Sequence, residues 1–456
     1  MSQVSGTIHR LAVILFAVLC ICNYFLKTIL LEYLCAVLLL ALVIKSMPKL
    51  AKPLKILAPC FFLAGCILLV ISRSDLRTWV LAFLRNANLL SMLICVPMIS
   101  MPFYYKDYQN ELKVLAQTKM QSIFGFCLLV NVFSHIIGIL FATGGIAITF
   151  ELFKPQSKLY RSDDTYITTV MRGYSSSGFW SPAWASMALV TSVLMVSWLS
   201  LIPIGLVFAL IFISMDLVTV AWKIKRKPGD FPRLEAQEGT SPNWRMLSVM
   251  LILALAMIGS LILGNLATPW ELLIVIPIVA AVFPIIVGVV QNHIPEYKKG
   301  MSDYYFNSLP KLHSQFAVFT AAGFFGKALD AAGVGDAIPG LLPAWLSSYP
   351  ALIVAALLLL FILPALIGVH PVATGTALVA AVAPAAIGID VMTYSMTILM
   401  GWILGTFLSP MTITSLVISG CTGRPPWSFL RLNYKFGIVA LVLFSFLISV
   451  TGPLLG

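Results

Sequence analysis

Long apolar segments without alternation constrain this chain more than any other feature of its sequence. Segments 252–263 and 352–366, for example, contain no charged residue, and polar and apolar side chains do not alternate in them. A helix of about 20 apolar residues crosses the hydrocarbon core of a bilayer, whereas the strands of a membrane barrel alternate with a period of two. With 60% hydrophobic and 10% charged residues, the chain is predicted to be an all-α polytopic membrane protein of about 10–12 transmembrane helices.

Basic residues gather in short loops beside these apolar segments, and they account for the formal net charge of +12. Cytoplasmic loops of membrane proteins carry such an excess of Lys and Arg. We therefore expect a multi-pass protein of a lipid bilayer, namely the bacterial inner membrane, with no nucleic-acid partner. The basic middle loop 223–245 is expected in the cytoplasm, and the C-terminus on the extracytoplasmic side.

Enzymatic and metal-dependent functions lack support in the sequence. The eight cysteines are scattered singly, which predicts buried free thiols rather than a metal site. Neither a His-Glu-x-x-His nor a Gly-x-Ser-x-Gly motif occurs, so no intramembrane enzyme is expected. We expect no cofactor apart from a coupling ion.

Two polar interruptions stand out in this apolar background. The segment 173–190 holds three consecutive serines, two glycines, a proline and two tryptophans, and a bilayer tolerates irregular backbone only where protein or a water-filled cavity covers it. A similar segment, 370–379, follows 189 positions after 181–190, with four identities: Pro182/Pro371, Ala188/Ala377, Leu189/Leu378 and Val190/Val379. Such matching interruptions predict a transporter of two inverted repeats with a site near the midplane.

These interruptions define the expected domains. They are N-terminal transmembrane helices (1–54), a first repeat (55–222) with a re-entrant hairpin at about 164–190, a cytoplasmic linker (223–245), and a second repeat (246–456) with a hairpin at about 351–384. Unwound backbone is expected at 200–205 and 409–414, and a further break at 143–145. The lysine cluster 45–55 is cytoplasmic on charge alone, but the inverted repeat places it outside with 73–85 inside, and we follow the repeat.

A helix ending in Ala-Thr-Gly-Gly (142–145) or Ala-Ala-Gly-Phe (321–324), a hairpin with a polar tip, and a helix unwound at Ser-Pro-x-Thr (409–412) follow one another in this chain. This arrangement resembles the ion transporter superfamily, which includes divalent anion:sodium symporters, arsenite and citrate permeases and the membrane subunits of tripartite dicarboxylate transporters. The resemblance implies an elevator-type transporter, usually a homodimer, with a scaffold and a moving transport domain. The Ser-Asn-Thr motif of the symporters is absent from both tips, which leaves the dicarboxylate assignment open.

Polar side chains of the two interruptions are the candidate ligands, because unwound helix ends supply oxygens to anions and hard cations. Arg172 is a candidate anion ligand, or else a partner of Asp163 or Asp164. His370 is a candidate for proton coupling or substrate contact, or else a structural donor. The alternative for the hydroxyls is that they pack close helices. The candidate substrate-binding residues are Arg172, Ser175, Ser176, Ser177, Ser181, His370, Thr374 and Thr376, and the candidate sodium ligands are Ser177, Pro203, Thr374, Ser409 and Thr412.

The function expected from these residues is secondary active transport of a small organic anion, a carboxylate. Neutral oxygens suit sodium better than a proton, since only His370 is placed to titrate, so sodium coupling is favoured. The alternatives are the membrane subunit of a tripartite transporter that needs a soluble binding protein, and an anion exporter or channel.

Overall fold

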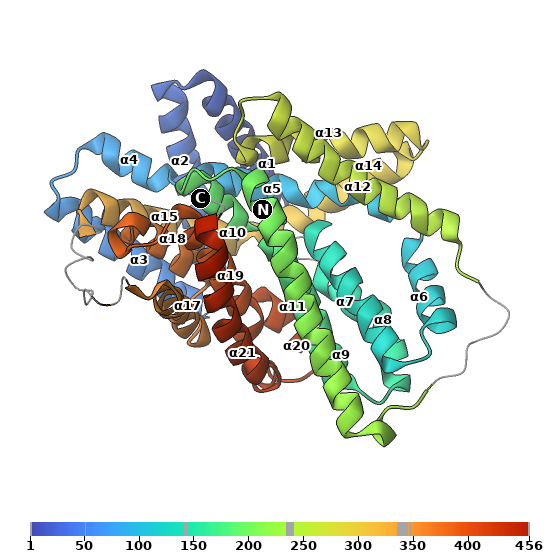
Figure 1. The fold of residues 1–456 in the computed structure, drawn as a ribbon. Coiled ribbons are helices and arrows are strands. Elements are labelled where there is room, and N and C mark those ends of the chain that lie inside the picture. Colours follow the sequence, from blue (N-terminus) through green and yellow to red (C-terminus); the bar gives the residue numbers. More distant parts are fainter. Residues whose placement is uncertain are drawn as a thin grey trace.

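The computed structural model describes residues 2–50, 52–140, 145–233, 241–334, 345 and 348–454, with side chains omitted for 2–5, 52, 53 and 454. Within these ranges every regular element is helical, and ten helices are long and apolar enough to cross a membrane. Two shorter apolar helices follow each other at 350–366 and 371–381. The predicted all-α, polytopic architecture is confirmed (Figure 1).

The helices fall into two sets that alternate along the chain. The first set contains α1 (Ser2–Leu26), α2 (Ile29–Ser46), α3 (Lys52–Ile71), α4 (Leu76–Leu84), α5 (Ala87–Ile99), α6 (Tyr108–Lys119), α12 (Trp244–Ala267), α13 (Leu272–Val290), α14 (Ile294–Asp303) and α15 (His313–Ala331). The second set contains α7 (Ile123–Leu140), α8 (Gly145–Leu159), α9 (Asp163–Ser176), α10 (Ala185–Val193), α11 (Trp198–Arg226), α17 (Pro350–Leu366), α18 (Pro371–Ala381), α19 (Val391–Leu408), α20 (Ile413–Thr422) and α21 (Trp427–Thr451).

The second set consists of two copies of one five-helix unit. α9 and α19 begin 228 positions apart, α10 and α20 begin at the same spacing, and the other three pairs agree within two residues. The sequence repeats at this spacing without a gap, through the identities Thr165/Thr393, Tyr166/Tyr394, Thr169/Thr397, Gly173/Gly401, Phe179/Phe407, Ser181/Ser409 and Pro182/Pro410. The true counterpart of Ser181 is therefore Ser409, and the expected pairing of 181–190 with 370–379 is wrong in register.

The two copies run in opposite directions. The ring of Phe208 on α11 contacts Phe444 on α21 at 5.3 Å between centroids, and Phe212 contacts Phe436 at 5.1 Å, so later residues of α11 meet earlier residues of α21. In Figure 1, α11 descends while α21 rises toward the end marked C. The packing is also repeated, because Phe179–Phe208 and its counterpart Phe407–Phe436 both have centroids 5.9 Å apart.

Each copy contains one hairpin and one interrupted helix, but the hairpin of the first copy is not where the sequence predicted it. α7 packs along α8, as α17 packs along α18. Segment 163–193 is instead a helix interrupted between α9 and α10, like 391–422 between α19 and α20. The cause is Ser-Pro at both points: Pro lacks an N–H and disfavours helical backbone at the residue before it. The tip of the first hairpin, including the predicted break at 143 and 144, lies outside the described residues.

The predicted unwinding at 200–205 does not occur. α11 runs from Trp198 to Arg226 without interruption, with Pro203 near its beginning. A proline removes only one intrahelical hydrogen bond there, and the helix continues. Pro203 is exposed on the surface of the molecule, so the candidate role of Pro203 in a sodium site is not supported by its position.

The first set of helices packs mainly on itself: α15 lies against α2, α3 and α4, and α5 lies against α1 and α13. The two sets meet most extensively where α15 contacts α18, and again where α10 contacts α5 and α13. Each packed set of helices therefore contains alternating segments of the chain, whereas the predicted domains were continuous ranges divided at loops.

The lysine cluster 45–55 lies beside segments from the second half of the chain, and its expected side of the membrane stays a prediction. Lys49 Nζ is 3.4 Å from His313 Nε2, and the Arg10 guanidinium lies 4.8 Å from the centroid of the Tyr305 ring. Lys49 therefore lies at the same end of the molecule as the beginning of α15. The tight α1–α2 turn brings the chain back to this end, and the 20-residue α3 then carries it across again, by about 30 Å.

Glycines allow the hairpins to approach the interrupted helices closely. A Cβ atom at Gly173 of α9 would lie 2.6 Å from the carbonyl oxygen of Asn131 on α7. At its counterpart Gly401, a Cβ would lie 2.8 Å from the ring of Phe361 on α17. Small residues at such positions let membrane helices pack backbone to backbone, which explains why this glycine recurs in both copies.

We expect Gly173→Ala to destabilise the protein by about 1–3 kcal/mol, because the new methyl group meets rigid backbone. Gly259→Ala on α12 is the matched control, since a Cβ there meets nothing within 4 Å, and its higher helix propensity should leave stability unchanged or raise it by up to about 1 kcal/mol. The measurement is the thermal unfolding midpoint of purified protein in detergent. Equal shifts in the two variants would contradict the close approach.

Candidate functional site

A cavity of about 360 Å³ lies where the two interrupted helices meet. Its walls contain counterparts from both copies, namely the pairs Tyr174/Trp402, Ala183/Met411, Trp184/Thr412 and Ala185/Ile413. The second hairpin adds Gly368, His370 and Pro371, and the first set of helices closes the cavity with Lys49, Leu93 and the beginning of α15. The cavity therefore spans the axis that relates the two copies and also touches the boundary between the two sets of helices.

Three helices begin at the wall of this cavity. Their N-cap residues, Trp184 for α10, His370 for α18 and Thr412 for α20, all line it. The N-terminus of a helix carries unpaired N–H groups and a partial positive charge. Lys49 and Lys311 lie at the rim, and no Asp or Glu occurs among the lining residues that the structure describes. This arrangement favours an anion.

The serine of each Ser-Pro interruption ties the broken helix to the neighbouring hairpin. Ser181 Oγ donates to the carbonyl of Ile139 near the end of α7 and accepts from the Ala183 N–H, both at 3.3 Å. In the second copy, Ser409 Oγ donates to the carbonyl of Ala365 at 2.5 Å and accepts from the Met411 N–H at 3.2 Å. Ser181 is fully buried and does not line the cavity, so the predicted substrate contact has become a contact with the protein's own backbone.

His370 is the predicted substrate residue that does reach the cavity. Its Nδ1 accepts a hydrogen bond of 3.2 Å from the Val372 N–H and so caps α18. Because Nδ1 accepts, a neutral ring carries its proton on Nε2. Its ring centroid lies 6.2 Å from that of Phe319 on α15. His370, at the hairpin tip, thus contacts the first set of helices.

The three consecutive serines form hydrogen bonds within their own helix. Ser175 donates to the carbonyl of Met171 at 2.8 Å, and Ser176 and Ser177 donate to Gly173 and Tyr174, both at 2.7 Å. All three are fully buried and none lines the cavity. Hydroxyls that bond to the preceding turn relieve the polarity of serine in a membrane helix, which is the structural alternative raised by the sequence.

Ser176 also belongs to a chain of hydrogen bonds around His135, a residue that the sequence analysis did not single out. Trp180 Nε1 donates to His135 Nε2 at 3.1 Å, so this nitrogen must accept. His135 Nδ1 then carries the proton and donates to Ser176 Oγ at 2.7 Å. These hydrogen bonds hold Trp180 beside the interruption. Trp184 lines the cavity and donates to the carbonyl of Gly138 at 3.0 Å.

The oxygens proposed for sodium are divided between paired and unpaired groups. Thr412 Oγ1 donates to the carbonyl of Thr406 at 2.7 Å, and the carbonyl of Ser409 accepts from Ser415 Oγ at 2.7 Å. The hydroxyls of Thr374 and Thr376 on α18 are buried and have no hydrogen-bond partner among the described residues. These two hydroxyls therefore have free hydrogen-bonding capacity.

Arg172 does not point into the cavity but forms a buried ion pair. Its Nη1 donates to Asp216 Oδ1 at 2.8 Å, its Nε donates to Asn433 Oδ1 at 2.9 Å, and its guanidinium lies 4.0 Å from the centroid of the Phe436 ring. Asn131 Nδ2 donates to the other oxygen of Asp216 at 2.8 Å. The expected pairing of Arg172 with Asp163 or Asp164 is therefore replaced by Asp216, and this pair joins α9, α11 and α21.

Several lining residues were missed by reasoning from sequence. Lys49 belongs to a cluster that was expected outside the membrane. His313, Ser314 and Gln315 belong to the polar beginning of an apolar helix, where such residues usually cap the helix or face water. Trp402 is identified as the counterpart of Tyr174 only when the two copies are aligned at the correct spacing.

Replacing Arg172 with Met leaves the Asp216 carboxylate buried without its cation, and we expect a loss of about 3–5 kcal/mol in the free energy of unfolding. The double variant Arg172→Met/Asp216→Leu removes both charges and should lose less than the sum of the single variants, by about 1–3 kcal/mol. Denaturant unfolding in detergent gives the free energy of unfolding of the unaltered protein, the two single variants and the double variant. Strictly additive losses would show that the pair is not coupled.

Neither a protein-family model nor a curated protein matches this chain. Among solved structures, it is similar to the YdaH transporter of Alcanivorax borkumensis, whose crystal structure is described as revealing an unusual topology. The match has a TM-score of 0.54 at 14% sequence identity and covers 86% of this chain and 97% of that chain. A similarity at this identity concerns the fold alone, so this chain is an all-α, polytopic membrane protein with the fold of a transporter.

Proposed function

We propose that this chain is a cation-coupled secondary transporter that moves a small organic anion, a carboxylate, across a cell membrane. The observation that supports this proposal is the cavity between the two copies, where the beginnings of α10, α18 and α20 converge. Lys49 and Lys311 at its rim add full positive charges, and acidic side chains are missing from the described part of its lining. A carboxylate entering the cavity exchanges water for helix N–H groups.

Transport in this proposal follows an elevator mechanism. The five-helix copies hold the anion between them and move as a unit against the first set of helices. The contact of α15 with α18 is the surface along which this movement occurs. His370 and Pro371, at the tip of the second hairpin, line the cavity together with the beginning of α15, so movement along this contact changes the wall of the anion site.

Sodium is favoured over a proton as the coupling ion. His370 is the titratable side chain at the hairpin tip, and its Nδ1 already accepts the hydrogen bond that caps α18. Protonation at Nδ1 would break this cap. By contrast, the unpartnered hydroxyl of Thr374 offers the neutral oxygen that a hard cation prefers.

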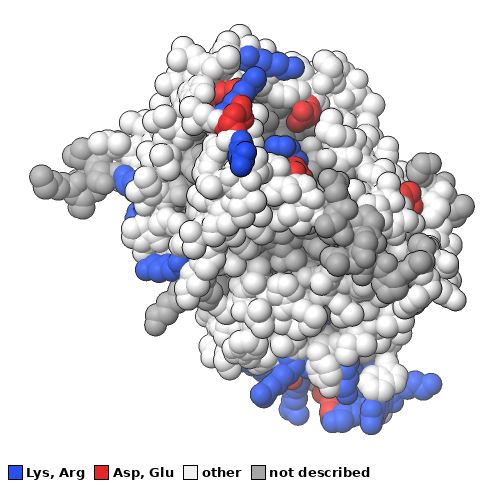
Figure 2. All heavy atoms as spheres, turned by 90° about the vertical axis from the view of Figure 1, so that its left-hand side faces the viewer, with Lys and Arg blue, Asp and Glu red and all other residues white. Residues whose placement is uncertain are grey.

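We further propose that the protein resides in a bacterial inner membrane as a homodimer, with its most basic end in the cytoplasm. Figure 2 shows Lys and Arg side chains gathered at the lower end of the molecule, below a broad band with few charged side chains. This end contains the last turn of α11, with Lys223, Lys225 and Arg226. Positive residues of short loops remain in the cytoplasm. No soluble binding protein is needed in this proposal.

Uptake of a panel of radiolabelled carboxylates into proteoliposomes tests the coupling. At fixed pH, an inward sodium gradient should drive accumulation. Thr374→Ala should raise the sodium concentration for half-maximal uptake by about tenfold, as expected for a lost ligand oxygen. Flux that ignores sodium, follows the pH gradient and loses this dependence in His370→Ala would overturn sodium coupling. Uptake only after addition of periplasmic extract would indicate a tripartite system, and non-saturable flux would indicate a channel.

The rim lysines should affect substrate affinity rather than turnover. We expect Lys49→Gln and Lys311→Gln each to raise KM by roughly three- to tenfold at low salt, because they attract the anion by charge. The difference should shrink above about 0.5 M salt, where charges at the surface are screened. Lys298→Gln is the matched control, since Lys298 is exposed on α14 and does not line the cavity. The same increase in all three variants would contradict this assignment.

A further inference from the structure

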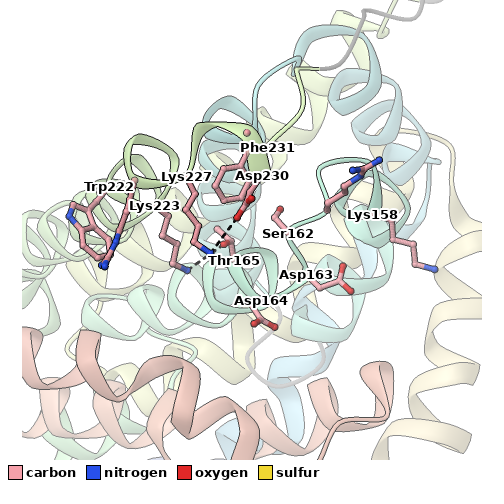
Figure 3. Close-up of a pocket in the computed structure, with 13 residues that line it drawn as sticks. Lys158, Ser162, Asp163, Asp164, Thr165, Trp222, Lys223, Lys227, Asp230 and Phe231 are labelled. Carbon is pink, nitrogen blue, oxygen red and sulfur yellow. Dashed lines mark hydrogen bonds and ion pairs between the residues drawn. The ribbon is translucent and has the colours of Figure 1, made fainter.

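A second cavity lies at the basic end, between the beginning of α9 and the end of α11. It has a volume of about 1010 Å³ and is lined by the turn between α8 and α9 on one side and by residues 222–231 on the other. Figure 3 shows Lys223 and Lys227 on the α11 side, with Ser162 and Thr165 from the beginning of α9 beside them. The substrate cavity shares none of its lining residues.

Cations in this second cavity exceed the carboxylates available to pair with them. Asp164 forms an ion pair with Arg424, and Asp230 forms one with Lys227 at 3.6 Å. Asp163 is the remaining acidic residue of the lining. Across the described ranges, four cations of the lining take part in no ion pair: Lys158, Arg161, Lys223 and Arg226.

Ser162 supplies a second and independent observation. It precedes α9 as the N-cap residue, yet its side chain makes no capping hydrogen bond. The residue is only 6% exposed, and its hydroxyl has no partner in the described part of the chain. A buried hydroxyl without a partner costs free energy. Ser162 lines the cavity at the beginning of α9, so a ligand that fills the cavity lies beside a hydroxyl without a partner.

The position of the cavity relative to the bilayer points to the source of its ligand. Trp222 is 57% exposed near the end of the transmembrane helix Trp198–Arg226, with the Arg226 guanidinium 5.1 Å from the centroid of its ring. Trp is enriched at the depth of lipid headgroups, and Lys and Arg beside it attract anionic lipids. The beginning of α9 adds the unpaired N–H groups that bind phosphate.

We propose that this cavity binds a phosphate group, presented by an anionic phospholipid headgroup or as free phosphate. The phosphate lies between the beginning of α9 and the basic end of α11. It accepts a hydrogen bond from the Ser162 hydroxyl, and the positive charges of Lys158 and Arg226 attract it. It thereby bridges two helices that are also joined by the hydrogen bond from Lys223 to Thr165 at this end and by the Arg172–Asp216 pair farther along both helices.

Thermal unfolding of the full chain in lipid nanodiscs tests this proposal and separates the two sources. One arm compares nanodiscs of phosphatidylglycerol with nanodiscs of phosphatidylcholine, and the other adds inorganic phosphate to the phosphatidylcholine nanodiscs. Lipid binding predicts a higher unfolding midpoint in phosphatidylglycerol alone, whereas a site for free phosphate predicts a rise with inorganic phosphate. Either rise supports the proposal only where it depends on the cavity residues.

Two variants and one control decide this dependence. Ser162→Ala should leave the midpoint in phosphatidylcholine unchanged or slightly higher, because it removes a buried hydroxyl that has no partner, and should weaken ligand binding by about fivefold. Lys158→Gln/Arg226→Gln should abolish most of the rise. Lys225→Gln/Lys435→Gln removes the same charge outside the cavity and should keep it. The proposal is overturned if neither ligand raises the midpoint, or if control and cavity variants respond alike.

Discussion

Every carbonyl and N–H group inside the hydrocarbon layer must find its partner within the protein, and this constraint determines how the two helices of this chain can be interrupted. At each Ser-Pro step the proline ends the helix, and the serine hydroxyl both donates to a carbonyl of the neighbouring hairpin and accepts from the N–H two residues later. One side chain thus replaces two lost backbone interactions. The hairpin cannot leave without exposing them.

The interruptions also create the electrostatics of the cavity. An uninterrupted helix would place its N-terminus at the membrane surface, whereas α10 and α20 begin in the interior of the protein, with His370 and α18 beside them. Positive potential is obtained there mainly from backbone, with full charges only at the rim. Ser175, Ser176 and Ser177, which have the residue types expected of ligands, instead complete the hydrogen bonding of α9.

Reasoning from sequence predicted the helical, polytopic architecture, the inverted repeat and the position of His370 at a hairpin tip, because hydrophobicity and helix-breaking residues are local properties. The register of the repeat was missed, since four identities near 181–190 and 370–379 competed with a longer and sparser match. Side-chain partners such as Asp216 for Arg172 could not be predicted, because they depend on which helix faces lie together. The same reason hid Lys49 and His313, which are 264 positions apart and meet at 3.4 Å.

The constant spacing between the two interrupted helices means that each position of one identifies a position of the other. Tyr174 and Trp402 are such a pair, as are Gly173 and Gly401. A spectroscopic probe introduced at one member of a pair therefore has an internal reference at the other, in the same molecule and in a matching helical environment. If the two copies move as a unit, a change confined to one signal reports a local rearrangement of that copy.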